Sequence, residues 1–425
     1  MSETTDHALL SPSGSYKWLA CPGSLVMEAG AQDDGNKYSD EGTCAHAVAA
    51  MCFTENKPAA AYIGRRIEVG NCRTYEFRED MAEHVQAYVN YVLHRVESYK
   101  LAGAESVDLF VEQRVPIGHV TLEQGAEGTA DAVIVAQWKT GMVLVDVTDL
   151  KFGQGREVRA EENPQLMLYT LGALELLSSI FDFTEPQLQI NVFQPRKQSL
   201  PSEWECSFER LKEFEAVARA ASAKALAVYQ DKPADIGECL IPGDHCREAF
   251  CKARATCPAL AAFVQEEIGV GFEVLAEKKE APPPDFAHAL HTQMDVVDLI
   301  EDWCRAVRAE VERRLLQGVP VPNYKLVQGR AGARAWADEA EAEKLLKSFR
   351  LKQEEMYSFK LVSPTQAEKL LKEQPKRWAK AQALVTRSDG KPSVAHVSDK
   401  RLAIVVKPII DEFETLAPQE VEGLV

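Results

Sequence analysis

Hydrophobic and polar residues alternate along two neighbouring segments, 128–138 and 142–151, and this alternation predicts two β-strands. Between them, residues 139–141 (Lys-Thr-Gly) fit a three-residue hairpin loop with its glycine in the left-handed position. Such a loop pairs Trp138 with Met142. The pattern therefore predicts an antiparallel hairpin whose register can be counted outward from the turn.

The register of this hairpin places two carboxylates opposite each other. Counting outward, Asp131 lies across from Asp149, and Lys151 emerges on the same side. The other residues of this face form one buried side and are all valines: Val133, Val135, Val143, Val145 and Val147. Opposed carboxylates repel each other, and a divalent cation such as Mg²⁺ or Mn²⁺ offsets that repulsion. The hairpin thus predicts a metal-dependent phosphodiesterase site in which Lys151 positions or deprotonates a water.

The flanking periodicities predict an α/β fold. An amphipathic helix is expected over 79–100 and a strand over 107–115, before the hairpin. A helix over about 163–177, a strand over 187–194 and a long helix over about 208–229 follow it. The order helix, three strands, helix, strand indicates a mixed sheet flanked by helices.

The ends of the chain carry different patterns and suggest the domain organisation. Helices are predicted near the N-terminus, and a cysteine-rich segment follows the sheet region. The three prolines at 282–284 cannot continue a helix and mark a linker. We therefore expect a first domain over 1–270, a Pro-rich linker over 271–289, and a basic, mostly α-helical C-terminal domain over 290–425.

Composition and charge narrow the class of protein. The chain of 425 residues is 46% hydrophobic and 27% charged, as in ordinary globular proteins. No apolar run reaches the ~20 residues of a membrane span, and no signal sequence is evident, so no membrane partner and a cytoplasmic location are expected. The net charge of −17 disfavours nucleic-acid binding, although residues 321–400 contain 16 Lys and Arg against 10 Asp and Glu.

Ten cysteines in such a compartment favour free thiols or metal ligands over disulfides. Cys246, Cys251 and Cys257 are close together in the sequence, and the distant Cys21 can supply a fourth thiolate. Four thiolates suit either zinc or an iron–sulfur cluster. For zinc, His245 and Cys239 are competing ligands.

Several other residues are weak evidence when taken alone. His46 and Glu112 have ordinary explanations as a helix histidine and a strand glutamate, although Glu112 could be a further acidic contributor. Gln165 and Tyr169 are four apart on a predicted helix and share one face. A second Asp-x-Lys sequence at 389–391 lies in a Ser-Asp-Gly-Lys-Pro turn, and we expect that one to be structural.

Together these residues resemble the RecB-like branch of the PD-(D/E)XK nuclease superfamily, in its iron–sulfur form. That form includes AddB-type helicase–nucleases and CRISPR-associated RecB-like exonucleases, and the chain is most similar to phage and prophage proteins of this type. The matches run in the family's order and are carried by these motifs: Ser11-Pro12-Ser13 with Trp18 and Cys21, Glu41-Gly42-Thr43 with His46, Gly128 to Asp131, Asp149-Leu150-Lys151, Gln165 to Tyr169, and the late cysteine triplet.

The resemblance implies roles for these residues. The catalytic residues would be Asp131, Asp149 and Lys151, and the ligands of Mg²⁺ or Mn²⁺ would be His46, both aspartates and the Leu150 carbonyl. The substrate would be held by Gln165 and Tyr169. The resemblance also implies that Cys21, Cys246, Cys251 and Cys257 hold a 4Fe-4S cluster. Because four residues separate Cys246 from Cys251 where the family has a Cys-x-x-Cys, zinc stays an alternative.

The function that the resemblance implies is a metal-dependent DNA exonuclease used in phage recombination or DNA processing. Its partners would be DNA and a single-strand annealing or other recombination protein. Two alternatives remain at this point. One is a catalytically inert DNA-binding or assembly protein that retains the nuclease fold, and the other is a structure-specific endonuclease.

Overall fold

A computed structural model of the chain describes residues 8–30, 37–70, 73–155, 157–197, 200–233, 235–266, 286–329, 334–357, 361–386, 390–396 and 401–404. Residue contacts divide the chain into two units, Met1–Trp303 and Cys304–Val425. The boundary falls within helix α10 (Phe286–Leu316), beyond the linker expected at 271–289. The start of α10 belongs to the first unit because its Leu299 packs against the cysteine-rich segment. Of the expected linker, residues 271–285 lie outside the described residues, and 286–289 begin α10.

The first unit is built on a mixed sheet of five strands in the order β3-β4-β5-β6-β7. Its strands are β3 (Ser106–Pro116), β4 (Glu127–Gln137), β5 (Val143–Leu150), β6 (Gln187–Phe193) and β7 (Ser202–Cys206). Only β5 and β6 pair in parallel, and helix α6 (Pro164–Leu177) connects them. The predicted α/β class is confirmed, whereas the edge strand β7 was not predicted.

The predicted register of the central hairpin is confirmed. Trp138 donates its amide N–H to the carbonyl of Met142 at 2.9 Å, and Gly141 has a left-handed φ of 86°. Strands β4 and β5 then pair residue by residue from Gln137 with Val143 to Ala132 with Thr148. Asp131 and Asp149 therefore occupy the next row, at the end of the ladder.

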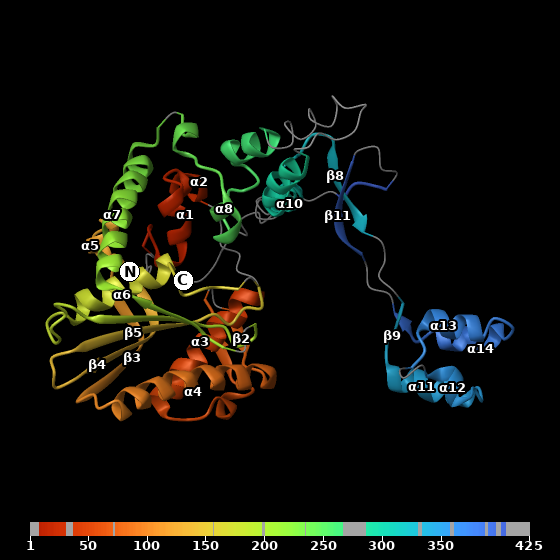
Figure 1. Ribbon diagram of the computed structural model, residues 1–425. Coiled ribbons are helices and arrows are strands. Elements are labelled where there is room, and N and C mark those ends of the chain that lie inside the picture. Colours follow the sequence, from red (N-terminus) through yellow and green to blue (C-terminus); the bar gives the residue numbers. More distant parts are fainter. Residues whose placement is uncertain are drawn as a thin grey trace, which may run out of the picture. The chain divides into compact units, whose positions relative to one another are not determined.

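Helices cover both faces of this sheet (Figure 1). The five valines of the predicted face are buried in one core together with residues of α6 and α7 (Phe208–Asp231). The opposite face, including Ile134, is buried under α3 (Lys37–Glu55) and α4 (Glu79–Leu101). Because β4 is buried on both sides, the carboxylates at the end of its pairing with β5 are held in a rigid frame.

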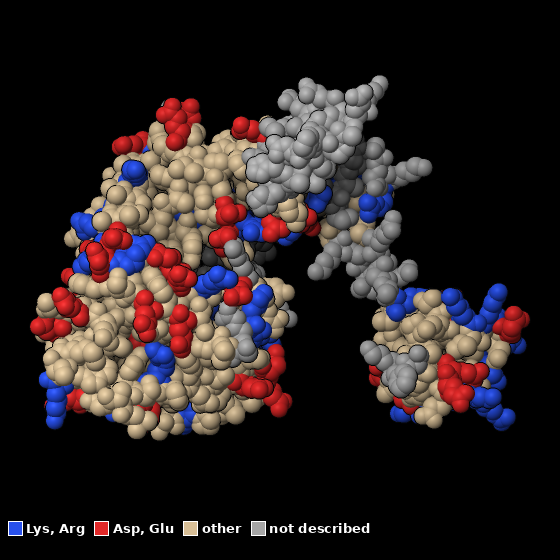
Figure 2. All heavy atoms as spheres, in the orientation of Figure 1, with Lys and Arg blue, Asp and Glu red and all other residues tan. Residues whose placement is uncertain are grey.

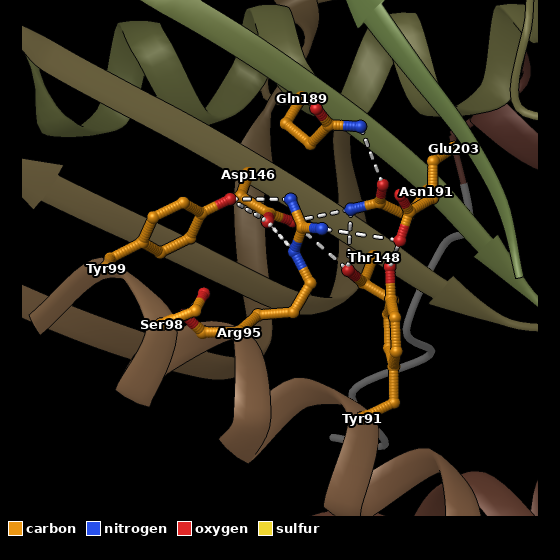
Figure 3. Close-up of polar contacts among 9 residues, drawn as sticks. All are labelled: Tyr91, Arg95, Ser98, Tyr99, Asp146, Thr148, Gln189, Asn191 and Glu203. Carbon is orange, nitrogen blue, oxygen red and sulfur yellow. Dashed lines mark hydrogen bonds and ion pairs between the residues drawn. The ribbon is translucent and has the colours of Figure 1, made fainter. Parts of the chain in front are cut away.

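A buried polar network ties α4 to the middle of the sheet (Figure 3). Asp146 on β5 is fully buried, and its Oδ2 accepts hydrogen bonds from Arg95 Nε at 2.6 Å and Tyr99 OH at 2.7 Å. Its Oδ1 accepts from Asn191 Nδ2 at 2.7 Å. The outer side of Arg95 reaches Glu203 at 3.3 Å. Both oxygens of the buried carboxylate are thus satisfied, as such a charge requires.

The N-terminal elements of the first unit lie against α6, α7 and the cysteine-rich segment. They comprise η1 (Pro12–Gly14), α1 (Ser15–Ala20) and α2 (Ser24–Glu28). The cysteine-rich segment contains η3 (Gly237–Cys239) and α8 (Asp244–Glu248). Smaller elements complete the unit: η2 (Ala59–Tyr62), α5 (Gly118–Thr121) and the paired strands β1 (Arg66–Glu68) and β2 (Thr74–Glu76).

The second unit combines helices with two pairs of strands. Strand β8 (Tyr324–Gly329) pairs with β11 (Gly390–His396), and β9 (Ala335–Trp336) pairs with β10 (Val385–Thr386). Four helices, α11 (Glu339–Ser348), α12 (Gln353–Met356), α13 (Pro364–Leu370) and α14 (Pro375–Gln382), surround a core that contains Leu346 and Leu371. Helices were predicted here, and the strand pairs were not. Within the described part of the chain, no helix combines the length and hydrophobicity needed to span a membrane.

Candidate functional site

The predicted carboxylates lie at the end of the β4–β5 ladder, where both are buried. Asp131 is 9% exposed and Asp149 is 2% exposed. The amide N–H of Leu150 donates to Asp131 Oδ2 at 2.7 Å, which fixes the orientation of this carboxylate. Leu150 also pairs with Phe193 of β6, so the main chain beyond Asp149 is held by the sheet. The site is therefore rigid on its sheet side.

Helix α3 brings His46 to Asp131. The ring Nδ1 of His46 lies 3.0 Å from Asp131 Oδ1. Burial lowers the pKa of His46, but the charge of Asp131 and this hydrogen bond outweigh it and raise the pKa to about 9. Burial alone would raise the pKa of Asp131, but the charge and hydrogen bond of His46 outweigh burial, so the pKa of Asp131 is lowered. The two residues thus form an ion pair at neutral pH. Two metal ligands that face each other can share a proton in this way when no metal is bound.

A third acidic residue, Glu112, joins this pair. Ligand atoms of His46, Glu112 and Asp131 all lie within 4.8 Å of one another, a grouping suited to a metal ion. Together with Leu150 and apolar side chains they line one small pocket. Glu112 as a whole residue is exposed, but partial desolvation of its carboxyl group and the charge of Asp131 raise its pKa to about 7. One imidazole and two carboxylates suit Mn²⁺ or Mg²⁺.

Lys151 links the carboxylates to helix α6. Its Nζ lies 3.0 Å from Asp149 Oδ2 and donates a hydrogen bond to Gln165 Oε1 at 2.9 Å. Gln165 Nε2 in turn donates to the hydroxyl of Tyr169 at 3.0 Å. Burial raises the pKa of Asp149 although the charge of Lys151 opposes this, and burial also raises the pKa of Tyr169. The residues predicted to act on substrate therefore form one continuous chain of contacts.

Gly128 packs closely against Tyr169 and against Pro12 of the N-terminal segment, and so brings these two residues together. A Cβ atom at Gly128 would lie 2.8 Å from Cε1 of Tyr169 and 2.7 Å from Cγ of Pro12. No larger side chain fits there unless the neighbours move. The glycine of the Gly-x-x-Asp motif thus allows Tyr169 to approach β4.

The four predicted cluster cysteines line one pocket in the first unit, together with His245 and other residues. Cys21 comes from the end of α1, Cys246 from α8, and Cys251 and Cys257 from the segment after α8. The amide of Ile241 donates to Cys21 Sγ at 3.5 Å. Burial raises the pKa of Cys21 and Cys246, and that of Cys251 to about 12.

The spacing of these thiols bears on which metal they could hold. A tetrahedral zinc ion with Zn–S bonds of ~2.3 Å holds its sulfurs about 3.8 Å apart. Among the described residues, no three of these cysteines bring their sulfurs within 4.8 Å of one another. The described positions of these thiols are therefore not those of a preformed zinc site. His245 faces the pocket with Nε2 at 3.7 Å from Cys246 Sγ, whereas Cys239 does not line it.

These two sites lie within one family match. Residues 7–402 match a protein family described as "Protein of unknown function (DUF2800)". The chain belongs to the DUF2800 family. The match spans the sheet, both candidate sites and most of the second unit, so the sites belong to the region that defines DUF2800.

The structure brings the predicted residues together in two groups. The first contains His46, Asp131, Asp149, Lys151, Gln165 and Tyr169, and the second contains the four cysteines. For Leu150, the amide contacts Asp131, and the predicted role of its carbonyl stays a prediction. Glu112 was underrated from the sequence, since its position depends on which residue of β3 lies beside Asp131. The register in which strands 107–115 and 128–138 pair decides which residue lies beside Asp131. A prediction of that register could have placed Glu112.

Proposed function

We propose that this DUF2800 protein is a metal-dependent DNA exonuclease with a PD-(D/E)XK-type core of the RecB-like branch. The observation that carries the proposal is the row of contacts from His46 through Asp131 to the Asp149–Lys151 pair at the end of a rigid hairpin. This combination of ligand types beside a half-buried lysine suits phosphodiester hydrolysis. The substrate would be DNA, and the protein would act in phage recombination or DNA processing, with an annealing or other recombination protein as a further partner.

Mg²⁺ or Mn²⁺ held by His46, Asp131, Asp149 and the Leu150 carbonyl would supply an activated water and charge neutralisation at the phosphate. Lys151 lies beside Asp149 and orients or deprotonates the attacking water. Its second contact, with Gln165, fixes the direction of the ammonium group. Gln165 and Tyr169 then hold the substrate strand on the α6 side of the site.

The cysteine site would have a structural role in this nuclease. Its four residues connect the N-terminal helices to the segment that follows α7, so a bound 4Fe-4S cluster would staple the two ends of the first unit together. The choice of a cluster over zinc rests on the resemblance and on the set of four cysteines, which suits either group. His245 is the nearest alternative ligand if zinc is bound instead.

The test is cleavage of linear and circular DNA by the full chain in Mn²⁺, with Asp149→Ala and Lys151→Ala beside the wild type. We expect both variants to lose at least about a hundredfold in rate, as removal of a charge-stabilising or proton-transfer group does. The matched control is Lys391→Ala in the second Asp-x-Lys sequence, which should cut at the wild-type rate.

The outcomes separate the candidate functions. Cleavage of linear DNA alone supports an exonuclease, and cleavage of circular DNA supports an endonuclease. If the wild type does not cut DNA but binds it, the inert DNA-binding alternative is favoured. If it cuts and both variants cut equally well, the assignment of the site is wrong.

A further inference from the structure

Three neighbouring strands each place a carboxylate in the same row. On β3, Val111 pairs with Ala132 and Gln113 pairs with Ala130, so Glu112 lies across from Asp131. Asp131 in turn lies across from Asp149 on β5, one row beyond the pair of Ala132 and Thr148. Asp131 is therefore flanked by an acidic residue on each side.

The backbone of Glu112 departs from the strand at this one point. Its φ of 47° is left-handed, a conformation that non-glycine residues adopt at an energetic cost. The residues on both sides keep their regular pairing with β4, so the departure is not a shift in register. The sheet thus holds Glu112 in a conformation in which its carboxyl group lies beside His46 and Asp131.

Asp149, on the other side of Asp131 in this row, makes a different contact. Its Oδ2 faces Lys151 at 3.0 Å, and Asp149 does not belong to the group of ligand atoms that lie within 4.8 Å of one another. The same Oδ2 is buried and accepts no hydrogen bond of normal geometry from the described residues. Apart from its ion pair with Lys151, this buried oxygen therefore has an unused acceptor position.

We infer that Glu112 is a direct ligand of the catalytic cation, together with His46 and Asp131. The inference rests on the proposed function for the presence of a cation, and it adds a ligand that the nuclease resemblance does not supply. Glu112 would add its carboxylate to the ligands already proposed, beside His46 and Asp131, while Asp149 also contacts Lys151. The carboxylates of Glu112 and Asp131 repel each other, because like charges on adjacent strands oppose each other unless a cation lies between them. A bound cation would remove this repulsion.

The experiment is a Mn²⁺ titration of the full chain, followed by calorimetry at pH 8, with Glu112→Gln beside the wild type. Glutamine keeps the size of the side chain and removes its charge. We expect Mn²⁺ affinity to fall at least about tenfold, which is the lower end of what even an outer-shell partner of a metal contributes. The matched control is Glu162→Gln, because Glu162 also has a left-handed φ, of 54°, but pairs with Arg210 at the surface.

A second measurement separates a ligand from a merely structural residue. In EDTA, Glu112→Gln should unfold at the same temperature as the wild type or higher, because a repulsion has been removed. Mn²⁺ should then raise the melting temperature of the wild type and of Glu162→Gln far more than that of Glu112→Gln. Equal Mn²⁺ affinity and equal stabilisation in Glu112→Gln and wild type would overturn the inference. Failure of the wild type itself to bind Mn²⁺ would instead overturn the proposed function.

Discussion

His46 and Asp131 form a pair whose protonation would compete with binding of the proposed metal. The pKa of His46 is raised to about 9, mainly by Asp131, so its ring carries a proton throughout the neutral range when no metal is bound. A metal ligand must be the neutral imidazole. Binding of a cation therefore has to release this proton, and it must also release the proton of Glu112 below a pH of about 7.

The apparent Mn²⁺ affinity should consequently rise with pH and level off above about pH 9. Between pH 7 and 9 we expect an increase of up to about tenfold per pH unit, since one proton is released. The raised pKa of His46 widens the pH range in which its ring is protonated, and a protonated ring cannot bind the metal. The affinity therefore increases as the pH rises. Calorimetry at several pH values measures the slope.

His46→Gln is the matched variant for this prediction. Its Mn²⁺ affinity should be lower at pH 9 and nearly independent of pH from 7 to 9, because the titrating ligand has been removed. If the variant retains the slope of the wild type, another group is responsible for the proton release.

At the scale of single elements, helix α4 is fastened to the sheet by the Arg95–Asp146 pair. Asp146 is fully buried, and the Arg95 side chain is only 17% exposed. The guanidinium group also lies over the rings of Tyr91 and Tyr99, at 5.9 Å and 5.4 Å from their centroids. Such a pair contributes little net stability relative to apolar residues, but the loss of one partner leaves a buried charge.

Arg95→Met should therefore lower the free energy of unfolding of the first unit by about 3–5 kcal/mol. Urea unfolding monitored by circular dichroism measures this loss. Glu203→Gln, which removes the charge of the outer partner of Arg95 and keeps an oxygen that can accept from the Tyr91 hydroxyl, should cost less than about 1 kcal/mol. Adding Asp146→Leu to Arg95→Met should recover part of the loss, and a double variant as unstable as the sum of its parts would contradict the pairing.

Local patterns were sufficient to predict the hairpin and the main helices and strands around it, but not the edge strand β7 or the contacts between elements. Alternation and Gly141 determined the register that places Asp131 beside Asp149. Strand β7 was missed because its five residues, at a sheet edge, contain two glutamates and only two apolar side chains. Contacts such as Arg95 with Asp146 depend on how α4 packs on β5, and neither segment alone indicates its partner.

The same distinction applies to the site. Gln165 and Tyr169 meet as their spacing of four residues suggests, whereas His46 was placed by the resemblance and the contact of Lys151 with Gln165 was not predicted. Glu112 has no such spacing, because its place is determined by the pairing of β3 with β4 and by a left-handed backbone. Residues that enter a site through tertiary pairing are therefore the ones that a single sequence leaves out.

Across the whole molecule, charge is distributed in a way that gives DNA little long-range attraction. The net charge is −17, and on the face drawn in Figure 2 acidic and basic side chains are interspersed. A negative net potential slows the approach of a polyanion. Contacts with DNA would therefore depend on short-range groups such as Lys151 and a bound cation.

The cysteine site is the other feature at this scale, because it joins distant parts of the chain. Cys21→Ser should lower the iron or zinc content of anaerobically purified protein and reduce its melting temperature, since a bound metal stabilises only the folded state. Metal analysis and thermal unfolding measure both effects. Cys304→Ser, on α10 and outside the cysteine pocket, should retain the wild-type metal content.

The contact between Cys21 and a distant segment also limits when the cysteine site can form during synthesis. The amide that binds Cys21 Sγ belongs to Ile241, 220 residues later in the chain. At a synthesis rate of ~5–20 residues per second, roughly 10 to 45 s separate the appearance of the first thiol from that of its partners. Throughout that interval Cys21 is an unprotected thiol on a nascent chain. If the four cysteines hold the proposed cluster, the yield of loaded protein would therefore depend on how reducing the cell is during translation, and not only on its supply of metal.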